Sequence, residues 1–469
     1  MARIYIETFG CQMNEADSQE VAFSAAAAGY DIAADPALAD VLVLNTCTVR
    51  DNAERRAYGR MNHFKLIKDA DPGVRLVVMG CLAEQDRERM QRLAPHVDAV
   101  FGTKQISELG ETLSAWRADF SEGEQPYSNE RALLAPFGGQ PDGVTDAFSH
   151  LRAFVSVQRG CSYYCTFCIV PYVRGRFDHR PIQAILADVR EKIQAGAREV
   201  MLVGQTVNAW RDPASGLDFG DLCRAVGALD GLERLSFISP HPKDFTESMF
   251  AEMAEIAQLN PRIHLPLQSG SDAMLRRMNR KYTRAQFSEK VEMIRRYLPG
   301  WAITTDLIVG FPAESDDDFR QTLEYVSTGV FANAFAFIYS PRRGTPAANW
   351  EQVPRSVASR RFTQLWDAQN AVTRAYHDRK IGTVERCLVS GPSKKDSSKL
   401  AAKTLDNVTV IVPIPSGLTN EALAQMPWVD VRIESAGVWG CTGTMLRRAG
   451  AYAEIGEAVA RPVLDLTIA

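Results

Sequence analysis

The sequence contains no run of about 20 apolar residues, the length that a helix needs to cross a membrane, so a membrane-spanning protein is not expected. Its opening residues, MARIYIETFG, lack the positive and apolar regions of a secretory signal peptide. We therefore expect a cytoplasmic protein whose thiols stay reduced. The formal net charge of −4 argues against a generally basic nucleic-acid binder, although a local basic face can still bind RNA.

The chain also lacks an obvious acid–base or nucleophile motif, but its nine cysteines are informative. In a reducing compartment, cysteines are more often ligands than disulfide partners. Six of the nine fall into two trios. The other three, Cys223, Cys387 and Cys441, stand apart in the sequence, and we expect them to be buried structural thiols.

One trio is Cys161, Cys165 and Cys168, within the segment RGCSYYCTFC. The spacing Cys-x3-Cys-x2-Cys follows the apolar run 153–157, so we expect the cysteines on a loop at the carboxyl end of a strand, where α/β folds carry their sites. Thiolates grouped so tightly select zinc, copper or iron–sulfur clusters. Three thiolates leave one coordination position open for a reacting molecule, whereas His179 as a fourth ligand would close a zinc site. Both interpretations are open at this point.

The other trio is spread over the first segment of the chain, and each member follows a short apolar run. These runs predict strands at 3–8, 41–44 and 76–79, and helical patterns follow them at 18–28, 53–70 and 84–93. The alternation predicts a parallel sheet, whose strands end along one edge. We therefore expect Cys11, Cys47 and Cys81 to converge on one metal centre. Three unrelated buried thiols are the alternative.

The middle of the chain repeats the alternation and predicts an open six-stranded relative of the β/α barrel. The expected strands are 153–157, 200–203, 235–238, 263–267, 303–309 and 335–339. The expected helices are 183–194, 222–229, 247–258, 285–296, 317–326 and 356–379. Three of the strands end in polar or glycine-rich segments, at 204–208, 266–271 and 306–312, which indicates a ligand pocket at that edge.

The last segment has a different pattern. Short alternating runs at 387–390, 408–412, 429–433 and 443–446 predict a small all-β barrel. It has more basic than acidic residues, in an otherwise acidic chain. Such a barrel can bind RNA through its phosphates, or it can simply pack against the rest of the protein.

The cysteine-rich segment resembles the radical S-adenosylmethionine (radical SAM) enzymes, whose motif is Cys-x3-Cys-x2-Cys with an aromatic residue, here Phe167, before the last cysteine. Together with TFGCQMNEADS at 8–18, NTCTVR at 45–50 and VMGCLAEQ at 78–85, the chain resembles the methylthiotransferase family over nearly its whole length. The resemblance implies an α/β fold class with three domains and two further segments: a methylthiotransferase domain at 1–118, a linker at 119–150, a radical SAM domain at 151–381, a TRAM (OB-like) RNA-binding barrel at 382–450 and a tail at 451–469.

The resemblance further implies two [4Fe–4S] clusters and SAM as cofactors. Cys161, Cys165 and Cys168 would bind the cluster that cleaves SAM, and Cys11, Cys47 and Cys81 would bind an auxiliary cluster that delivers sulfur. By the same resemblance and the polar strand ends, the residues expected to contact SAM are Phe167, Gly204, Gln205, Asn208, Gln268, Ser269 and Asp306. The residues expected to contact RNA are Arg342, Arg343, Lys403 and Arg432.

The activity that the resemblance implies is the methylthiolation of carbon 2 of N6-isopentenyl-adenosine at position 37 of tRNA, next to the anticodon. The partners would be the tRNA anticodon loop, an electron donor and a sulfur donor, without a membrane, and the protein would be a monomer. One alternative keeps the chemistry but changes the substrate to threonylcarbamoyl-adenosine in tRNA or an aspartate of a ribosomal protein. A remote alternative is a non-catalytic zinc or iron–sulfur RNA-binding protein.

Overall fold

The computed structural model describes residues 2–48, 51–120, 151–415, 419–425 and 427–448. They form two compact units, and each is described separately below. The first unit contains the described residues up to 120 together with 159–162 and 169–177, and the second contains the others. From residue 121 on, the expected linker lies outside the described residues, as does the whole expected tail at 451–469. In the described part of the chain, no helix is long and apolar enough to span a membrane.

A five-stranded parallel sheet forms the centre of the first unit, in the order β2-β1-β3-β4-β5. Its strands are β1 (Arg3–Thr8), β2 (Asp31–Ile32), β3 (Val41–Thr46), β4 (Arg75–Gly80) and β5 (Ala99–Phe101). The helices of this unit are α1 (Gln12–Ala27), α2 (Asp51–Ala70), α3 (Cys81–Gln85), α4 (Arg87–Leu93), α5 (Ile106–Trp116) and α7 (Val170–Arg174), with single 3₁₀ turns at η1 (Pro36–Leu38) and η2 (Arg117–Asp119).

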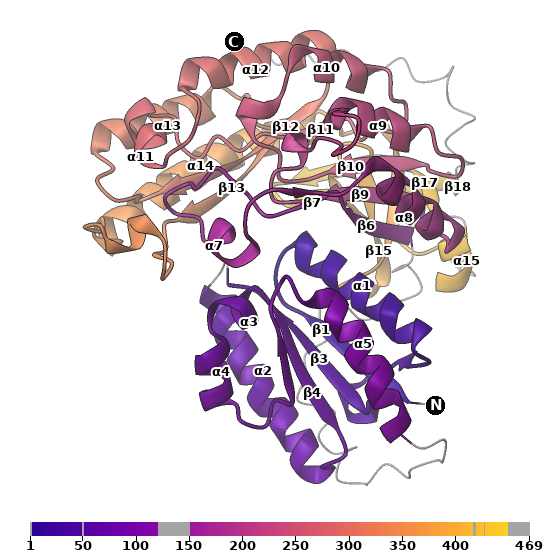
Figure 1. Cartoon of the computed structure of the whole chain (residues 1–469). Helices are drawn as coiled ribbons and strands as arrows, with labels where there is room; N and C mark the ends of the chain where they lie inside the picture. The colour runs from indigo at the N-terminus through magenta and orange to yellow at the C-terminus, as the bar shows by residue number, and fades with distance from the viewer. Residues whose placement is uncertain (1, 49–50, 121–150, 416–418, 426, 449–469) are drawn as a thin grey trace. The chain divides into compact units, whose positions relative to one another are not determined.

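Helices cover both faces of this sheet (Figure 1), and the alternation of side chains along β3 explains why. Leu42 and Leu44 pack in a cluster with Phe64 of α2. Val41 and Val43 point to the other face, where they pack with residues of α1 and α5. Because both faces are covered, β3 is apolar at successive positions, as is typical of parallel sheets. The three expected strands and their parallel order are confirmed, whereas the expected helix 84–93 is interrupted at Asp86 between α3 and α4.

The second unit contains six parallel strands in two three-stranded sheets, in the orders β10-β9-β6 and β11-β12-β13. The strands are β6 (Arg152–Ser156), β9 (Glu199–Val203), β10 (Arg234–Phe237), β11 (Arg262–His264), β12 (Ala302–Val309) and β13 (Asn333–Ile338). Two further short strands are β7 (Gln158–Arg159), on the boundary of the units, and β8 (Asp178–His179). All six expected strands are present, although β11 ends at His264 and is shorter than expected.

The helices of this unit follow the strands in alternation, as expected. They are α8 (Ile182–Gln194), α9 (Phe219–Gly227), α10 (Glu247–Ala254), α11 (Asp272–Arg277), α12 (Arg284–Tyr297), α13 (Asp316–Ser327) and α14 (Arg355–Asp378), with 3₁₀ turns at η5 (Val207–Ala209), η6 (Pro242–Asp244) and η7 (Pro346–Asn349). Alternate strand residues, such as Val200, Leu202, Leu307 and Val309, join one apolar core with these helices. The intervening residues lie on the other face of the strands, which leaves polar side chains such as Asp306 outside that core.

The carboxyl-terminal part of the second unit is a closed five-stranded barrel, in the order β14-β15-β16-β18-β17. Its strands are β14 (Val384–Ser393), β15 (Asp396–Thr404), β16 (Thr409–Pro413), β17 (Trp428–Gly437) and β18 (Gly440–Arg448), and it also has a short helix, α15 (Asn420–Gln425). The barrel was expected, but β15 was missed because its sequence, DSSKLAAKT, is polar. Pairing with β14 and β16 on its two sides makes this segment a strand.

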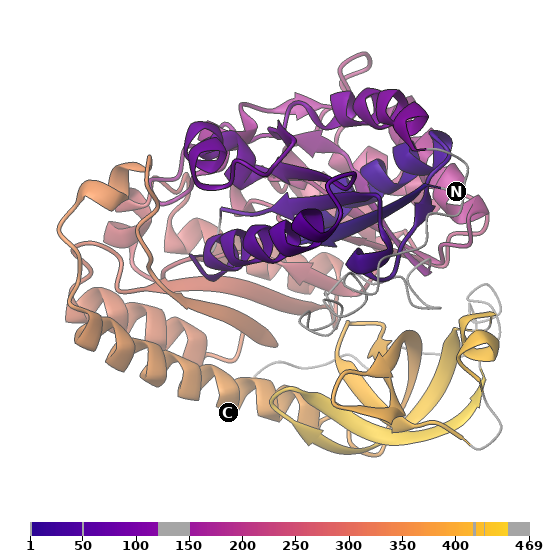
Figure 2. The ribbon, with the colours of Figure 1, turned by 90° about the horizontal axis from the view of Figure 1, so that it is seen from below.

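Helix α14 leads into the barrel, as Figure 2 shows. The imidazole Nδ1 of His377, near the end of α14, lies 2.6 Å from the backbone oxygen of Gly437 in the barrel. Lys380 forms an ion pair of 3.0 Å with Asp406, and a guanidinium nitrogen of Arg234 donates to the Thr404 carbonyl at 3.2 Å. These contacts attach the barrel to α14 and to the amino end of β10, at the opposite end of the strands from the expected ligand pocket.

Candidate metal centres and cofactor site

Cys11, Cys47 and Cys81 follow three adjacent parallel strands of the first unit. Cys11 comes three residues after the end of β1, Cys47 follows β3 directly, and Cys81 is the first residue of α3 after β4. The order β1-β3-β4 therefore brings all three cysteines to the carboxyl edge of one sheet, as the sequence predicted. We call these three residues and their loops the auxiliary site.

The loops of the auxiliary site are tied to one another. The backbone nitrogen of Phe9 donates to the Asn45 carbonyl at 2.8 Å, and the Asn14 amide donates to the Asn45 side chain at 2.8 Å. A Cβ added to Gly10 would lie 2.8 Å from the Cβ of Cys47. Gly80 has a φ of +101°, and a Cβ added to it would lie 2.4 Å from the carbonyl oxygen of Thr46. A larger residue fits at neither position, because the backbones approach too closely.

Arg174 of α7 joins the auxiliary site. Its Nε donates to the sulfur of Cys81 at 3.2 Å, and its Nη2 donates to the Asp17 carboxylate at 2.8 Å. Burial raises the pKa of the Cys81 thiol above its usual value, against the opposing effect of the Arg174 charge. Burial also works against the charge of Arg174, but Cys81 and Asp17 outweigh it, so the pKa of Arg174 is raised.

The residues of the auxiliary site fit an iron–sulfur cluster. No group of three His, Cys, Asp or Glu side chains that could hold a single metal ion is found among the residues that the structure describes. Three thiols on one sheet edge, with a buried arginine donor at one of them, suit that soft and anionic cluster.

The second trio is divided between the two units, so its members are described separately. In the first unit, the backbone nitrogen of Cys161 donates to the Gly175 carbonyl at 3.0 Å. In the second unit, the nitrogen of Cys168 donates to the Cys165 carbonyl at 2.9 Å, and Arg280 donates from Nη1 to the buried Cys165 sulfur at 3.4 Å. The ring of Phe167 contacts Phe311 edge-on, at 6.3 Å between ring centroids.

His179, the alternative zinc ligand, has a different environment. Its Nδ1 accepts a hydrogen bond of 3.2 Å from the backbone nitrogen of Arg211 in the second unit. Burial lowers the pKa of His179, with Asp178 opposing this effect.

Buried polar atoms without a partner gather near the carboxyl ends of β6, β9 and β10. Within the described part of the chain, no hydrogen-bond partner exists for either side-chain atom of Gln158, for Oε1 of Gln205, for Nε2 of His241 or for one oxygen of Asp244. Such atoms are rare in folded proteins and often mark a ligand site. Burial keeps the pKa of His241 well below its usual value, with smaller contributions from Arg280 and Lys243, so the imidazole is neutral.

The other residues expected to contact SAM have mixed roles in the second unit. The Asn208 side chain forms two hydrogen bonds with the backbone of His241: its amide nitrogen donates to the carbonyl at 2.9 Å, and its oxygen accepts from the backbone nitrogen at 2.7 Å. Ser269 contacts Thr322, with 3.2 Å between the hydroxyl oxygens. Gln268 adopts a positive φ of 69° and its nitrogen donates to the Asp306 carbonyl at 2.8 Å. Gly204 and Gln205 follow β9 directly.

Asp306 has a partly accessible polar side chain. Its carboxylate is 32% exposed and lies 3.1 Å from Nε2 of His264 on β11. The other ring nitrogen of His264 lies 3.1 Å from the Thr304 hydroxyl, and its ring contacts Phe335 of β13 edge-on. Sequence reasoning missed Gln158, His241 and His264, because no local pattern distinguishes them from ordinary strand-end residues.

The residues expected to contact RNA differ in accessibility. Arg343 and Arg432 are exposed, and Arg342 is half-buried. Lys403 is half-buried and its Nζ donates to the Thr409 hydroxyl at 2.6 Å. Burial, together with the charges of Arg152 and Arg262, lowers the pKa of Lys403 to about 8. Lys403 therefore loses its proton at a lower pH than a surface lysine does.

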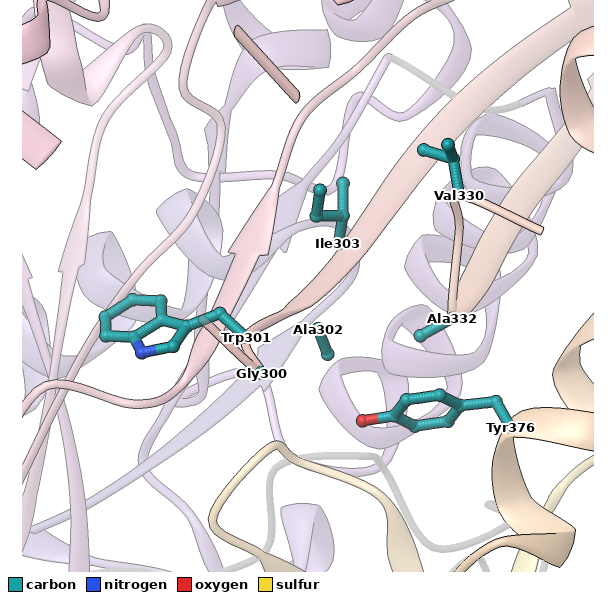
Figure 3. Close-up of a pocket in the computed structure, with 7 residues that line it drawn as sticks. All are labelled: Gly300, Trp301, Ala302, Ile303, Val330, Ala332 and Tyr376. Atoms are coloured by element: carbon teal, nitrogen blue, oxygen red, sulfur yellow. The ribbon is translucent and has the colours of Figure 1, made fainter. Parts of the chain in front are cut away.

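A small cavity of the second unit lies away from these residues (Figure 3). It is at the amino end of β12, whereas Asp306 lies further along that strand. Its lining is mostly apolar, and the indole nitrogen of Trp301 and the hydroxyl of Tyr376 are the polar side-chain atoms: Gly300, Trp301, Ala302, Ile303, Val330, Ala332 and Tyr376. This lining contains no His, Cys, Asp or Glu side chain.

The three lone cysteines are buried, as expected for structural thiols. Burial raises the pKa of Cys223 and of Cys387 far above the usual range for a thiol, and it raises the pKa of Cys441 to about 11. These thiols therefore stay protonated and have little nucleophilic character near neutral pH.

Comparison with known proteins identifies the family. The model of the "Radical SAM superfamily" matches residues 155–326, and the model of "Uncharacterized protein family UPF0004" matches residues 3–102. A relative from Moorella thermoacetica, named tRNA-2-methylthio-N(6)-dimethylallyladenosine synthase, is 37% identical over 94% of this chain and 98% of its own length. The chain belongs to the tRNA-2-methylthio-N(6)-dimethylallyladenosine synthase family. Relatives of the same name from Thermobifida fusca (40% identical, over 88% of this chain and 84% of the relative) and Desulfitobacterium hafniense (37%, over 93% and 95%) agree.

Membership in this synthase family makes the chain an enzyme with SAM and [4Fe–4S] clusters as cofactors. Solved structures share its fold at low sequence identity. The methyltransferase TsrM from Kitasatospora setae, solved with cobalamin and a [4Fe–4S] cluster, matches with a TM-score of 0.53 and 12% identity, over 74% of this chain and 77% of that chain. The shared fold confirms the expected α/β fold class, and the family-model match at 155–326 confirms the radical SAM domain.

Proposed function

We infer that this synthase-family chain methylthiolates carbon 2 of N6-isopentenyl-adenosine at position 37 of tRNA. The support is the identity of 37% with a relative of that name over 98% of the relative's length. The alternative substrates, threonylcarbamoyl-adenosine and a ribosomal-protein aspartate, gain no support, because the three curated relatives described above all carry the dimethylallyl name. A non-catalytic RNA-binding protein is disfavoured by the radical SAM match.

The observation that carries the site assignment is the convergence of three cysteines at one sheet edge. We assign Cys11, Cys47 and Cys81 to the auxiliary [4Fe–4S] cluster, and Cys161, Cys165 and Cys168 to the cluster that binds SAM. When bound, the second cluster supplies the electron that cleaves SAM to a 5′-deoxyadenosyl radical. The chain's own part is to hold both groups, to orient the substrate and to exclude water.

For SAM we retain Phe167, Gly204, Gln205, Asn208, Gln268, Ser269 and Asp306 as the proposed contacts. Gln205 and Asp306 have the strongest support. Gln205 has a buried oxygen without a partner in the described part of the chain, and Asp306 has a partly exposed carboxylate. Gln158 and His241 extend this set, because each has a buried polar atom in the same situation. Asn208 acts by shaping the backbone at His241.

We propose one function for each expected domain: binding of the auxiliary cluster at 1–118, radical chemistry at 151–381 and RNA binding at 382–450. In this proposal the tRNA anticodon loop, a single-stranded target, is held by Arg342, Arg343, Arg432 and, to a lesser degree, Lys403. An electron donor and a sulfur donor serve the enzyme, which acts as a cytoplasmic monomer.

The test is an assay with purified, cluster-loaded protein. The protein is incubated with SAM, a chemical reductant and tRNA that either carries or lacks the isopentenyl group, and the digested nucleosides are analysed by mass spectrometry. We expect a methylthio group on the isopentenyl-adenosine and none on the unmodified adenosine. A methylthio group on threonylcarbamoyl-adenosine, or on a ribosomal-protein peptide, would instead select one of the alternatives.

A further inference from the structure

The guanidinium of Arg174 is buried in the first unit beside Cys81. Its side chain is 3% exposed, and the side chain of its partner Asp17 is 1% exposed. Nε donates to the Cys81 sulfur at 3.2 Å and Nη2 donates to Asp17 at 2.8 Å. The third nitrogen, Nη1, is buried and has no hydrogen-bond partner among the residues that the structure describes. One donor of a buried cation is therefore unused beside a candidate cluster ligand.

Several contacts hold this guanidinium in place. α7 carries Arg174 as its last residue, and Ile169 and Val173 from the same segment pack directly against Cys81. The hydroxyl of Thr103, which follows β5, donates to the Val173 carbonyl at 2.6 Å. A rotation of α7 away from the sheet would break these contacts, so the distance between Nε and the sulfur is determined by the packing of the unit.

Such an arrangement is costly unless an anion lies beside it. Burying a guanidinium removes its hydration, and one carboxylate that leaves a donor unpaired compensates only in part. An apolar side chain in this place would avoid that cost. Thiolate ligands and the cluster that they hold carry negative charge, and donors outside the ligand set are known to orient such ligands and tune the metal group.

We propose that Arg174 is the positioning residue of the auxiliary cluster: its N–H orients the Cys81 thiolate, and its charge raises the reduction potential of the cluster. The proposal rests on the assignment of Cys11, Cys47 and Cys81 as ligands. The physical reason is that the reduced cluster carries one more negative charge than the oxidised cluster. A nearby cation and an N–H donor at the sulfur therefore stabilise the reduced form more. Asp17 opposes this effect, since it partly neutralises Arg174.

The experiment measures the midpoint potential of the auxiliary cluster in the full chain. The three cysteines of the other trio are replaced (Cys161→Ala, Cys165→Ala, Cys168→Ala) so that only the auxiliary cluster contributes to the reduced EPR signal. Into this background we introduce Arg174→Gln, Arg174→Lys or Asp17→Asn. Arg176→Gln is the matched control, because Arg176 lies on the same segment and is exposed.

We expect Arg174→Gln to shift the potential to a more negative value and Asp17→Asn to shift it to a more positive value. Arg174→Lys, which keeps the charge but loses the planar donor, should shift it less than Arg174→Gln, and Arg176→Gln should leave it unchanged. These opposite signs are the decisive readout, because a general loosening of the site would move the Arg174 and Asp17 variants in the same direction.

Unchanged potentials in both variants, or shifts of the same sign, would overturn the proposal. If Arg174→Gln does not retain iron, Arg174→Lys and Asp17→Asn still test the proposal, because their midpoint potentials should shift in opposite directions. A background variant that binds no iron at all would contradict the ligand assignment in the proposed function, and this result is distinguishable because it precedes any change at Arg174.

Discussion

Arg280 donates a hydrogen bond of 3.4 Å from Nη1 to the sulfur of Cys165, and Arg174 donates one of 3.2 Å from Nε to the sulfur of Cys81. Each candidate cluster site thus has its own arginine at one cysteine, Arg174 buried and Arg280 half-buried. Arg280 also donates to the Pro266 carbonyl and, through Nε, to the Tyr282 hydroxyl at 3.0 Å. These contacts hold the cysteine loop against the segment that follows β11.

We expect Arg280→Gln to reduce the cleavage of SAM by about tenfold or more, the usual effect of removing a group that supports a metal ligand. The reason is that Cys165 loses both a donor and a compensating charge. The measurement is the rate of 5′-deoxyadenosine formation by the reconstituted protein. Arg276→Gln is the matched control, because Arg276 is exposed on the neighbouring α11. An Arg280→Gln protein that matches wild type would remove Arg280 from the cofactor site.

The two-cluster assignment predicts iron content. Wild type should bind about eight irons per chain after anaerobic reconstitution, and the triple variant Cys11→Ala, Cys47→Ala, Cys81→Ala should bind about four, since each [4Fe–4S] cluster contains four. Iron and acid-labile sulfide are measured together. Replacing the buried, isolated Cys223 by alanine is the control and should leave the iron content unchanged. Equal iron in wild type and the triple variant would mean that the first trio is structural.

We expect the half-buried Lys403 to make the stability of the protein depend on pH. Burial lowers its pKa to about 8 in the folded protein, compared with about 10.4 in an unfolded chain. Between these values the unfolded state binds more protons, so the contribution of Lys403 to the free energy of unfolding rises with pH. Below pH 8, Lys403 is charged in both states and its burial costs the full amount.

The measurement is denaturant unfolding of wild type and Lys403→Met between pH 7 and about pH 10. We expect the variant to be the more stable protein near pH 7 and to lose this advantage as the pH rises. The surface variant Lys399→Met provides the control, since Lys399 is exposed. A difference between wild type and Lys403→Met that does not change with pH would contradict the lowered pKa.

We expect a large loss of stability when the buried ion pair of Arg361 and Glu314 is broken. Nη1 of Arg361 on α14 donates to the Glu314 carboxylate at 2.8 Å, and the two side chains are 5% and 1% exposed. Arg361→Ala leaves that carboxylate buried without its cation, so we expect a loss of about 3–5 kcal/mol in the free energy of unfolding. The double variant Arg361→Met, Glu314→Gln should lose less. Equal losses in the two proteins, measured by denaturant unfolding, would argue against a desolvation cost.

We predict that Trp439 contacts RNA, which the sequence alone did not indicate. Its side chain is 80% exposed at the turn between β17 and β18, and its ring lies beside that of Trp366. Exposed aromatic rings can stack on unpaired bases, and such a contact contributes about 1–3 kcal/mol. We expect Trp439→Ala to weaken tRNA binding by this amount at every salt concentration.

The same binding measurement distinguishes stacking from phosphate contact. Arg432→Ala should reduce the salt dependence of tRNA binding by about one unit of slope, because Arg432 is exposed and is one of the residues proposed to bind tRNA phosphate. Lys403→Met should change the slope less, since that lysine is half-buried and bound to Thr409. Binding that is unchanged in both Trp439→Ala and Arg432→Ala would move the tRNA interface away from β17 and the turn that follows it.

Local pattern was sufficient for most of the elements. The buried strands β3 and β4 have continuous apolar runs, at 41–44 and 76–79, and the strand 303–309 was predicted although polar residues interrupt it. Polar strands were harder to predict. β15 was missed because its residues alternate weakly, and it becomes a strand only through its two neighbours in the barrel. Helix α10 ends at Ala254. The predicted helix was longer, because the apolar pattern continues into the turn that follows.

The sequence by itself determined the cysteine spacing, the alternation of strands and helices, and the carboxyl-edge placement of Cys11, Cys47 and Cys81. Each of these follows from short-range pattern and from the way parallel strands align. Only the tertiary structure decided which arginine meets which sulfur. Arg174 lies 93 positions from Cys81, and Arg280 lies 115 positions from Cys165. The packing of α7 and of the segment after α11 brings each pair together, and no local pattern records contacts over that separation.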